Sequence, residues 1–252
     1  MTSLEGTVAL VTGSSRGIGA EIARLFAAEG AHVVLHGRDR DALDRVHASI
    51  TAANGQALVV TGDVTRYDDL EAMRTTVEDE VGPVTILVAN AGGSTTPPAP
   101  LEDISPADWR AAVDGNLTAT FLTIKCFLPG MKARGAGAII TMSSAAARRP
   151  SPFSPLAYAT AKAGVGLLTQ DAAAQAGPHG VRINCIAPEA ILTERNSTEI
   201  PPAVQAHLRD QHPIRRLGTP NDVARAALFL ATDNSAWITG IILDVAGGSV
   251  LT

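Results

Sequence analysis

The sequence is poor in basic residues and cysteines, and each shortage excludes a class of function. Its 252 residues carry a net charge of -5 and form no basic stripe, so a nucleic-acid partner is not expected. The only two cysteines, Cys126 and Cys185, stand far apart, without the paired spacing of a zinc site or a disulfide framework. We therefore expect two buried free thiols in a reducing compartment and no metal site.

Long apolar runs and targeting signals are also missing. No stretch approaches the roughly 20 apolar residues that cross a bilayer. The N-terminus, MTSLEGTVALVTG, lacks the basic region and long apolar core of a signal peptide. We expect a cytoplasmic protein with no membrane partner. Apolar material is nevertheless plentiful, with 46% hydrophobic and 18% charged residues, which predicts a globule with a substantial core.

Short β-branched apolar runs alternate with helix-like stretches, which is typical of a parallel sheet covered on both faces. The runs predict seven strands, at residues 7–12, 32–36, 57–61, 84–89, 137–142, 181–187 and 241–245. Helices are predicted between them, at residues 17–29, 40–53, 67–80, 106–133, 156–176 and 221–231. The predicted fold class is α/β, a single domain over residues 1–252 with a doubly wound seven-stranded parallel sheet.

An eight-stranded barrel is the alternative architecture, because it also alternates strand and helix over about this length. The strand count argues against it, and so does a glycine cluster directly after the first strand, where a dinucleotide fold has its phosphate loop. Two irregular segments, at residues 92–100 and 188–216, follow the carboxyl ends of strands. Open α/β sheets bind ligands at that edge.

The glycine cluster lies in VTGSSRGIGAEIARLF, between an apolar strand and an amphipathic helix. Gly13, Gly17 and Gly19 permit a tight turn and a close approach of the backbone to a pyrophosphate. The helix N-terminus adds unpaired N–H groups and partial positive charge. An ordinary strand-to-helix turn could contain such glycines, but the strand and helix on either side favour a nucleotide site.

A tyrosine and a lysine in YATAK form the second notable pattern. Tyr158 and Lys162 are four residues apart, so in a helix they project from the same face. A nearby ammonium group lowers the pKa of a phenol, by roughly three units at about 4 Å. The pair therefore predicts a tyrosine that works as an acid or base near neutral pH, although two residues at helical spacing alone are a weak motif.

Several separated motifs occur in one order: TGSSRGIG, then ANAGG, ITMSS and YATAK. In this the sequence resembles the short-chain dehydrogenase/reductase (SDR) family, of the classical type, over essentially its full length. It is similar to 3-oxoacyl-[acyl-carrier-protein] reductase-like members. The resemblance implies a Rossmann fold and an NAD(P)-dependent oxidoreductase that acts on a carbonyl or secondary alcohol.

The resemblance also implies where a cofactor is held. It places Asp63 at the adenine amino group and Thr193 at the nicotinamide carboxamide, although Asp63 also suits a helix cap or a turn. The expected cofactor-binding residues are Gly13, Ser15, Arg16, Gly17, Ile18, Gly19, Arg38, Asp63, Val64, Asn90, Gly92, Tyr158, Lys162, Pro188 and Thr193.

Charge at the end of the second strand bears on the choice between NADP(H) and NAD(H). Gly37 stands where NAD-preferring members of the family carry an acid, and Arg38 follows it. Arg16 and Arg38 together suit a 2'-phosphate, whereas Asp39 complicates the balance unless it caps the next helix. NADP(H) is the expected cofactor, and NAD(H) remains possible.

The resemblance assigns a catalytic role to four residues: Asn116, Ser144, Tyr158 and Lys162. Tyr158 would protonate the substrate oxygen, Ser144 would orient that oxygen, and Lys162 would lower the tyrosine pKa and bind the nicotinamide ribose. Ser143 is the reserve for Ser144. Asn116 would hold a water beside the lysine, and a buried structural hydrogen bond is its alternative role.

One departure from the family pattern follows the sixth strand. Pro188 is present, but Glu189 replaces the usual glycine. Because glutamate resists backbone angles that glycine tolerates, we expect an altered loop conformation. A carboxylate near the nicotinamide would also disfavour an anionic substrate. Residues 188–216 as a whole are the expected substrate lid.

Other functions and the assembly state stay open at this level. A non-catalytic cofactor sensor or a scaffold without nucleotide is possible, but a sensor needs none of the four catalytic residues and a scaffold needs no glycine loop. The expected partner is a small carbonyl or alcohol substrate. Relatives form tetramers through surfaces like the Ala-rich helices and closing strand found here, so we expect a homotetramer or homodimer.

Overall fold

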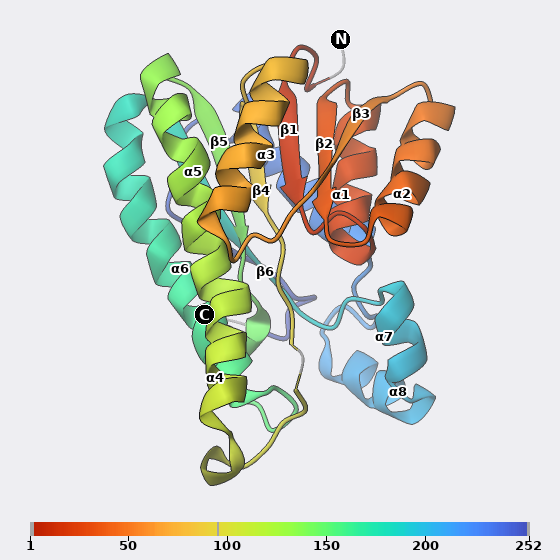
Figure 1. Ribbon diagram of the computed structural model, residues 1–252. Coiled ribbons are helices and arrows are strands. Elements are labelled where there is room, and N and C mark those ends of the chain that lie inside the picture. Colours follow the sequence, from red (N-terminus) through yellow and green to blue (C-terminus); the bar gives the residue numbers. More distant parts are fainter. Residues whose placement is uncertain (1–2, 95, 251–252) are drawn as a thin grey trace.

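Seven parallel strands form one sheet in the order β3-β2-β1-β4-β5-β6-β7 (Figure 1). The computed structural model describes residues 3–94 and 96–250; residues 1–2, 95 and 251–252 of the expected 1–252 domain lie outside the described residues. The strands are Val8–Thr12 (β1), His32–Gly37 (β2), Gln56–Thr61 (β3), Ile86–Ala89 (β4), Gly137–Met142 (β5), Val181–Pro188 (β6) and Ile242–Val245 (β7). The predicted α/β, doubly wound, seven-stranded fold is confirmed.

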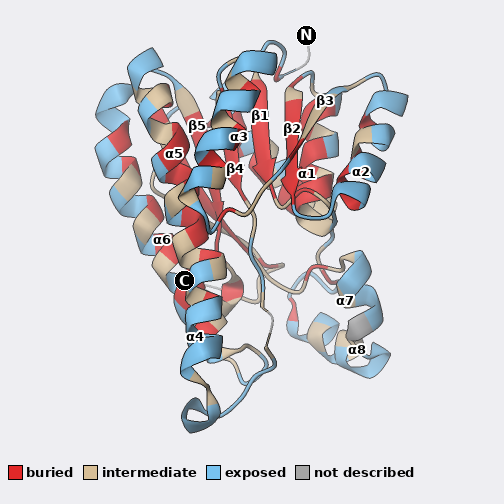
Figure 2. Ribbon diagram, in the orientation of Figure 1, coloured by how far each residue is buried: buried red, intermediate tan, exposed pale blue. Residues whose placement is uncertain are grey.

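Helices cover both faces of the sheet and bury it. One face is covered by α1 (Gly17–Ala28), α2 (Arg40–Ala52) and α9 (Pro220–Ala231), and the other by α3 (Tyr67–Glu80), α5 (Ala119–Arg134) and α6 (Leu156–Ala176). Side chains alternate along β1, with Ala9 and Val11 in the first core and Val8 and Leu10 in the second. Two-sided burial explains why the central strands β1 and β4 are almost continuously apolar (Figure 2).

Helix starts follow the local chemistry of the chain. Asp39 caps α2 by accepting a hydrogen bond from the Ala42 N–H, so the capping role considered for it is confirmed. Thr219 and Asp222 form a reciprocal capping box at α9, where Pro220 occupies the first turn. These caps satisfy N–H groups that a helix leaves unpaired.

The helix predicted at residues 106–133 is divided in three. It consists of α4 (Pro106–Val113), a π-helical turn (Asp114–Thr118) and α5. Such wider turns inside helices are frequent at functional sites, and this one contains Asn116. The described residues also form short 3-10 helices at Leu101–Asp103, Ala145–Ala147, Gly177–His179 and Asp233–Ser235.

Two helices lie in the segment 188–216, which the sequence pattern left irregular. They are α7 (Glu194–Glu199) and α8 (Pro202–Gln211), and both lie beyond the sheet in Figure 1. Thr193 caps α7 by accepting from the Asn196 N–H, and α8 begins with a proline. Their lengths of 6 and 10 residues are too short for a clear periodicity, so only these start signals could have revealed them.

The order of the strands places a crevice beside β1. Its neighbours are β2 and β4, so the chain leaves β1 toward one side and leaves β4 toward the other. Ligands bind at such a switch point, outside the carboxyl ends of the strands.

Elsewhere in the fold, Cys126 and Cys185 are buried free thiols, as predicted. Within residues 3–94 and 96–250, no helix is long and apolar enough to cross a membrane, and no acidic, histidine or cysteine group could hold a metal.

Candidate active site

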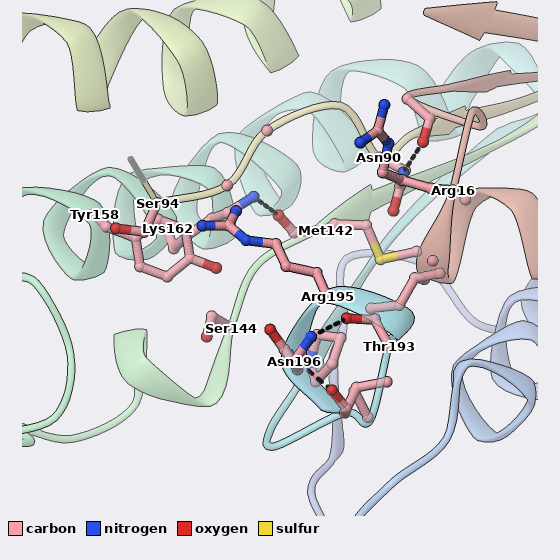
Figure 3. Close-up of a pocket in the computed structure, with 18 of the residues that line it drawn as sticks. Arg16, Asn90, Ser94, Met142, Ser144, Tyr158, Lys162, Thr193, Arg195 and Asn196 are labelled. Atoms are coloured by element: carbon pink, nitrogen blue, oxygen red, sulfur yellow. Dashed lines mark hydrogen bonds between the residues drawn. The ribbon is translucent and has the colours of Figure 1, made fainter. Parts of the chain in front are cut away.

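A cavity of about 690 Å³ opens at the carboxyl edge of the sheet, a volume in the range of small-molecule and cofactor sites. It brings together residues from the glycine loop, the ends of β4, β5 and β6, helix α6 and the segment around α7 (Figure 3). Twelve of the predicted site residues line it: Gly13, Arg16, Gly17, Ile18, Gly19, Asn90, Gly92, Ser144, Tyr158, Lys162, Pro188 and Thr193.

The glycine loop is packed so closely that side chains would not fit. Gly13 has a φ of +68°, and a Cβ on it would lie 2.9 Å from Ala91 Cα. A Cβ on Gly19 would lie 2.4 Å from the Gly13 carbonyl oxygen. Asn90 ties the loop to β4, because its Nδ2 donates to the carbonyls of Thr12 (3.0 Å) and Gly13 (3.2 Å). The loop therefore has a fixed shape and presents backbone to the cavity.

Tyr158 and Lys162 both line the cavity from α6. The Lys162 Nζ lies 5.8 Å from the centre of the Tyr158 ring and donates to the Met142 carbonyl at 2.7 Å. Burial lowers the pKa of Lys162 to about 8. Burial also raises the pKa of Tyr158, which a hydrogen bond with Ser144 opposes. The expectation that Lys162 lowers the pKa of Tyr158 is therefore wrong for this structure. Burial of the phenol outweighs the hydrogen bond with Ser144, and the lysine bonds to a backbone carbonyl.

The two serines that end β5 point to different places. Ser143 is buried, and its hydroxyl donates to the Lys162 carbonyl at 2.7 Å. Ser144 caps the following 3-10 helix by accepting from the Ala146 N–H, and its side chain bonds to Tyr158. Ser144 is thus the serine whose hydroxyl meets the tyrosine, whereas Ser143 holds the backbone of α6 against β5.

Asn116 is buried and its side chain bonds to backbone. Its Oδ1 accepts from the Gly93 N–H at 2.9 Å, and its Nδ2 donates to the carbonyls of Gly93 (3.0 Å) and Ala112 (2.9 Å). It does not line the cavity itself. Asn116 therefore makes the buried structural hydrogen bonds that were its alternative role. It holds the loop after β4, whose Gly92 and Gly93 do line the cavity.

Comparison with known proteins decides the family. A family model described as enoyl-(acyl carrier protein) reductase matches residues 13–250. The chain is 38% identical to 7alpha-hydroxysteroid dehydrogenase of Escherichia coli K12 over 247 residues, which covers 98% of this chain and 95% of that relative. This chain belongs to the SDR family. It is accordingly an NAD(P)-dependent oxidoreductase of the class that acts on CH–OH or C=O groups.

Solved SDR structures agree with this placement. A 3-oxoacyl-[acyl-carrier protein] reductase from Brucella melitensis with bound NAD has a TM-score of 0.92 and 34% identity, and covers 100% of this chain and 94% of its own. A gluconate 5-dehydrogenase from Burkholderia cenocepacia, in complex with NADP and tartrate, has a TM-score of 0.91 and 32% identity, covering 98% and 96%. These two relatives hold different cofactors, NAD in the first and NADP in the second.

The cavity fits a dinucleotide on the evidence of its own residues. Helix α1 starts at the cavity, and no side chain caps its N-terminus, so its first N–H groups can meet a phosphate. A Cβ on Gly17 would lie 3.3 Å from the Thr193 side chain, which narrows the site between the glycine loop and the segment around α7. Gly13, Gly17 and Gly19 would thus hold a diphosphate.

Four of the expected SDR cofactor contacts do not line this cavity: Ser15, Arg38, Asp63 and Val64. The Asp63 carboxylate accepts from the backbone and the hydroxyl of Thr65, which makes it a turn residue in this structure and lowers its pKa. Arg38 lies close enough to contribute to that lowering. The Val64 side chain packs in the core. These residues surround the carboxyl ends of β2 and β3, beside the cavity.

Glu189, which replaces the glycine usual in SDRs, is not strained. The positive φ of this loop occurs one residue later, at Ala190 (φ 47°), where a left-handed backbone costs a non-glycine residue roughly 1 kcal/mol. The Glu189 carboxylate bonds to the Ser249 hydroxyl and lies 4.0 Å from Arg149. The expectation that the Glu189 carboxylate lies near the nicotinamide is therefore wrong, because Glu189 is turned away and does not line the cavity.

Sequence reasoning missed several residues of this SDR site. Ser94, Glu194, Arg195 and Asn196 line the cavity from the loop after β4 and from α7. Irregular or very short segments supply all four, so no periodicity marked them. Only their location at the expected ligand edge of the sheet was a signal.

Proposed function

We propose that this SDR reduces a substrate carbonyl, and in reverse oxidises a secondary alcohol, with Tyr158 as proton donor and acceptor and NADP(H) as the preferred cofactor. The observation that carries the proposal is the bond between Tyr158 and Ser144 at the cavity. Because its pKa is raised, the phenol is protonated at neutral pH and available as an acid.

The roles of the residues follow from this protonation state. A bound nicotinamide cofactor supplies or accepts the hydride. Tyr158 gives its proton to the substrate oxygen, while the Ser144 hydroxyl donates a hydrogen bond to the same oxygen as charge develops. Lys162, held by the Met142 carbonyl, places an ammonium near the phenolate that remains and stabilises it. Asn116 positions the loop after β4 and, as the family resemblance implies, supports the return of the proton.

Following NADPH absorbance with a panel of carbonyl compounds tests the reaction. The panel contains acetoacetyl thioesters, a ketosteroid and a ketose, because the relatives do not agree on one substrate. We expect NADPH-dependent reduction of at least one compound, with 3-oxoacyl thioester reduction as a candidate activity. Tight NADPH binding without turnover of any compound would instead indicate a cofactor-binding sensor.

The expected preference for NADP(H) rests on Arg16 and Arg38, and the Asp39 carboxylate opposes it. Arg16 pairs with Asp39 at 2.7 Å, and both side chains are about half exposed. In Asp39→Asn the amide keeps the cap of α2 but no longer repels a 2'-phosphate, so the NADPH Kd should fall by about 3- to 10-fold. Fluorescence titration measures this Kd.

The wild-type protein should also react faster with NADPH than with NADH at equal low concentration; the opposite order contradicts the proposal.

The remaining expectations concern assembly, location and boundaries. We propose a homotetramer or homodimer in the cytoplasm, with one catalytic domain over residues 1–252 and a substrate lid at 188–216. Phe121 on α5 and Leu167 on α6 are 47% and 62% exposed, and such apolar side chains on neighbouring helices support association. Light scattering of the purified protein measures the assembly state.

A further inference from the structure

The charges that line the cavity are mostly positive. Among the described residues, three cations line it, Arg16, Lys162 and Arg195, against one carboxylate, Glu194. A concave site with an excess of one sign attracts ligands of the opposite sign. The cavity therefore favours an anionic ligand in addition to the hydride chemistry.

The three cations occupy different parts of the cavity. Lys162 is buried and bonds to the Met142 carbonyl, and Arg16 lies at the glycine loop beside Asp39. Arg195 extends from α7 into the cavity, toward the side where Ser94 and Tyr158 lie and away from Arg16 (Figure 3). Arg195 is thus the cation on the side of the cavity where the substrate would react.

Two hydrogen bonds made by Asn196 hold the start of helix α7 in place. The Asn196 Nδ2 donates to the Ile191 carbonyl at 2.8 Å, and the Asn196 N–H donates to the Thr193 hydroxyl at 3.2 Å. These contacts join the start of α7 to the segment that follows β6. Because the helix start is fixed, the neighbouring Arg195 is presented to the cavity with less freedom to lose on binding.

The carboxylate that would have repelled an anion points elsewhere. Glu189 bonds to Ser249 and lies beside Arg149, and it does not line the cavity. Glu194, which does line it, is exposed, as Arg195 is, and it is outnumbered by the three cations. The objection to an anionic substrate that rested on Glu189 is thereby removed.

We propose that Arg195 binds a carboxylate of the substrate, so that the enzyme interconverts oxo acids and hydroxy acids. An arginine fork matches a carboxylate with two parallel hydrogen bonds. In the reductive direction the carbonyl gains a hydride at carbon and the Tyr158 proton at oxygen, while NAD(P)H is oxidised to NAD(P)+. The inference rests on the proposed function for the reacting carbonyl. The cofactor diphosphate is the other source of anionic oxygens, and the test separates the two.

The test compares acids with their neutral amides in wild type and Arg195→Gln. The probes are 4-oxopentanoate with 4-oxopentanamide, and 3-oxocyclohexanecarboxylate with its carboxamide. We expect Arg195→Gln to lower kcat/KM for the acids by about 10- to 100-fold, the range for losing a hydrogen bond to a charged group, and for the amides by less than about 3-fold. Arg195→Lys should retain part of the activity on acids, because it keeps the charge without the fork.

Arg45→Gln is the matched control, since Arg45 lies on α2, outside the proposed lid, is exposed and does not line the cavity; it should leave both substrate classes unchanged. Equal losses on acids and amides in Arg195→Gln would overturn the proposal. So would an NADPH Kd that rises by the same factor as the loss on acids, because Arg195 would then bind the cofactor diphosphate.

Binding without turnover distinguishes this proposal from the proposed reaction. Cyclohexanecarboxylate and cyclohexanecarboxamide are titrated by calorimetry into protein saturated with NADP+. We expect the acid to bind wild type and to bind Arg195→Gln about 10- to 100-fold more weakly, and the amide to show no such difference. If the acid binds in this way but no ketone is reduced, the proposal that Arg195 binds a carboxylate is supported and the proposed carbonyl reduction is rejected. If the acid does not bind wild type, the carboxylate site is overturned.

Discussion

Tyr158→Phe should lower kcat for carbonyl reduction by about 100- to 10,000-fold, the usual contribution of a positioned general acid, and leave the NADPH Kd within about 2-fold of wild type. The substitution removes only the hydroxyl, so the ring still fills its place on α6 while no proton is delivered to the substrate oxygen. Steady-state kinetics and NADPH fluorescence titration measure the two effects separately. A fall confined to kcat identifies an interaction that matters in the transition state.

The chain offers a matched control, because it has only one other tyrosine. Tyr67 lies on α3, where its ring packs beneath the Lys125 ammonium at 4.6 Å, and it does not line the cavity. Tyr67→Phe should therefore keep wild-type kcat. If Tyr158→Phe retained more than about a tenth of wild-type turnover, Tyr158 would not be the proton donor and the proposed mechanism would be withdrawn.

Gly19→Ala should destabilise the fold and weaken NADPH binding together. The added Cβ would lie 2.4 Å from the Gly13 carbonyl oxygen and 2.6 Å from Asn90 Nδ2, so it would separate the loop from β4. Overpacking of this kind costs about 1–3 kcal/mol, occasionally more, and we expect the NADPH Kd to rise at least about 10-fold as the loop shifts. Urea unfolding gives the first quantity and fluorescence titration the second.

Gly177→Ala controls for the general effect of replacing glycine. Gly177 follows α6 with right-handed helical angles, and a Cβ there would meet no heavy atom within 4 Å. Its free energy of unfolding should change by less than about 0.5 kcal/mol, with an unchanged NADPH Kd. Wild-type stability and wild-type cofactor affinity in Gly19→Ala would show that the close packing of the glycine loop is not needed.

Much of the fold could be predicted because its signals are local. The central strands β1 and β4 are short apolar runs buried on both faces, and α9 begins with a proline, a threonine cap and an acidic residue in its first turn. Helices α7 and α8 escaped prediction because they are short and bury little apolar surface, as the exposed residues of α8 show (Figure 2). The π-helical turn at Asn116 also escaped, since its backbone bonds continue those of the flanking helices.

The sequence by itself determined the family, the parallel sheet, the glycine loop and the residues that could react, because each depends on residue type at a short, fixed spacing. Only the tertiary structure decided how those residues are used. In the structure the Ser144 side chain bonds to Tyr158, whereas the Ser143 hydroxyl bonds to the backbone of α6. The Asn116 side chain bonds to the loop after β4. The Glu189 carboxylate bonds to Ser249, away from the cavity. The tertiary structure also brought Arg195 on α7, far along the chain from the glycine loop, to the same cavity. Burial and hydrogen-bond partners are set by segments far apart in the chain, and no local pattern encodes them.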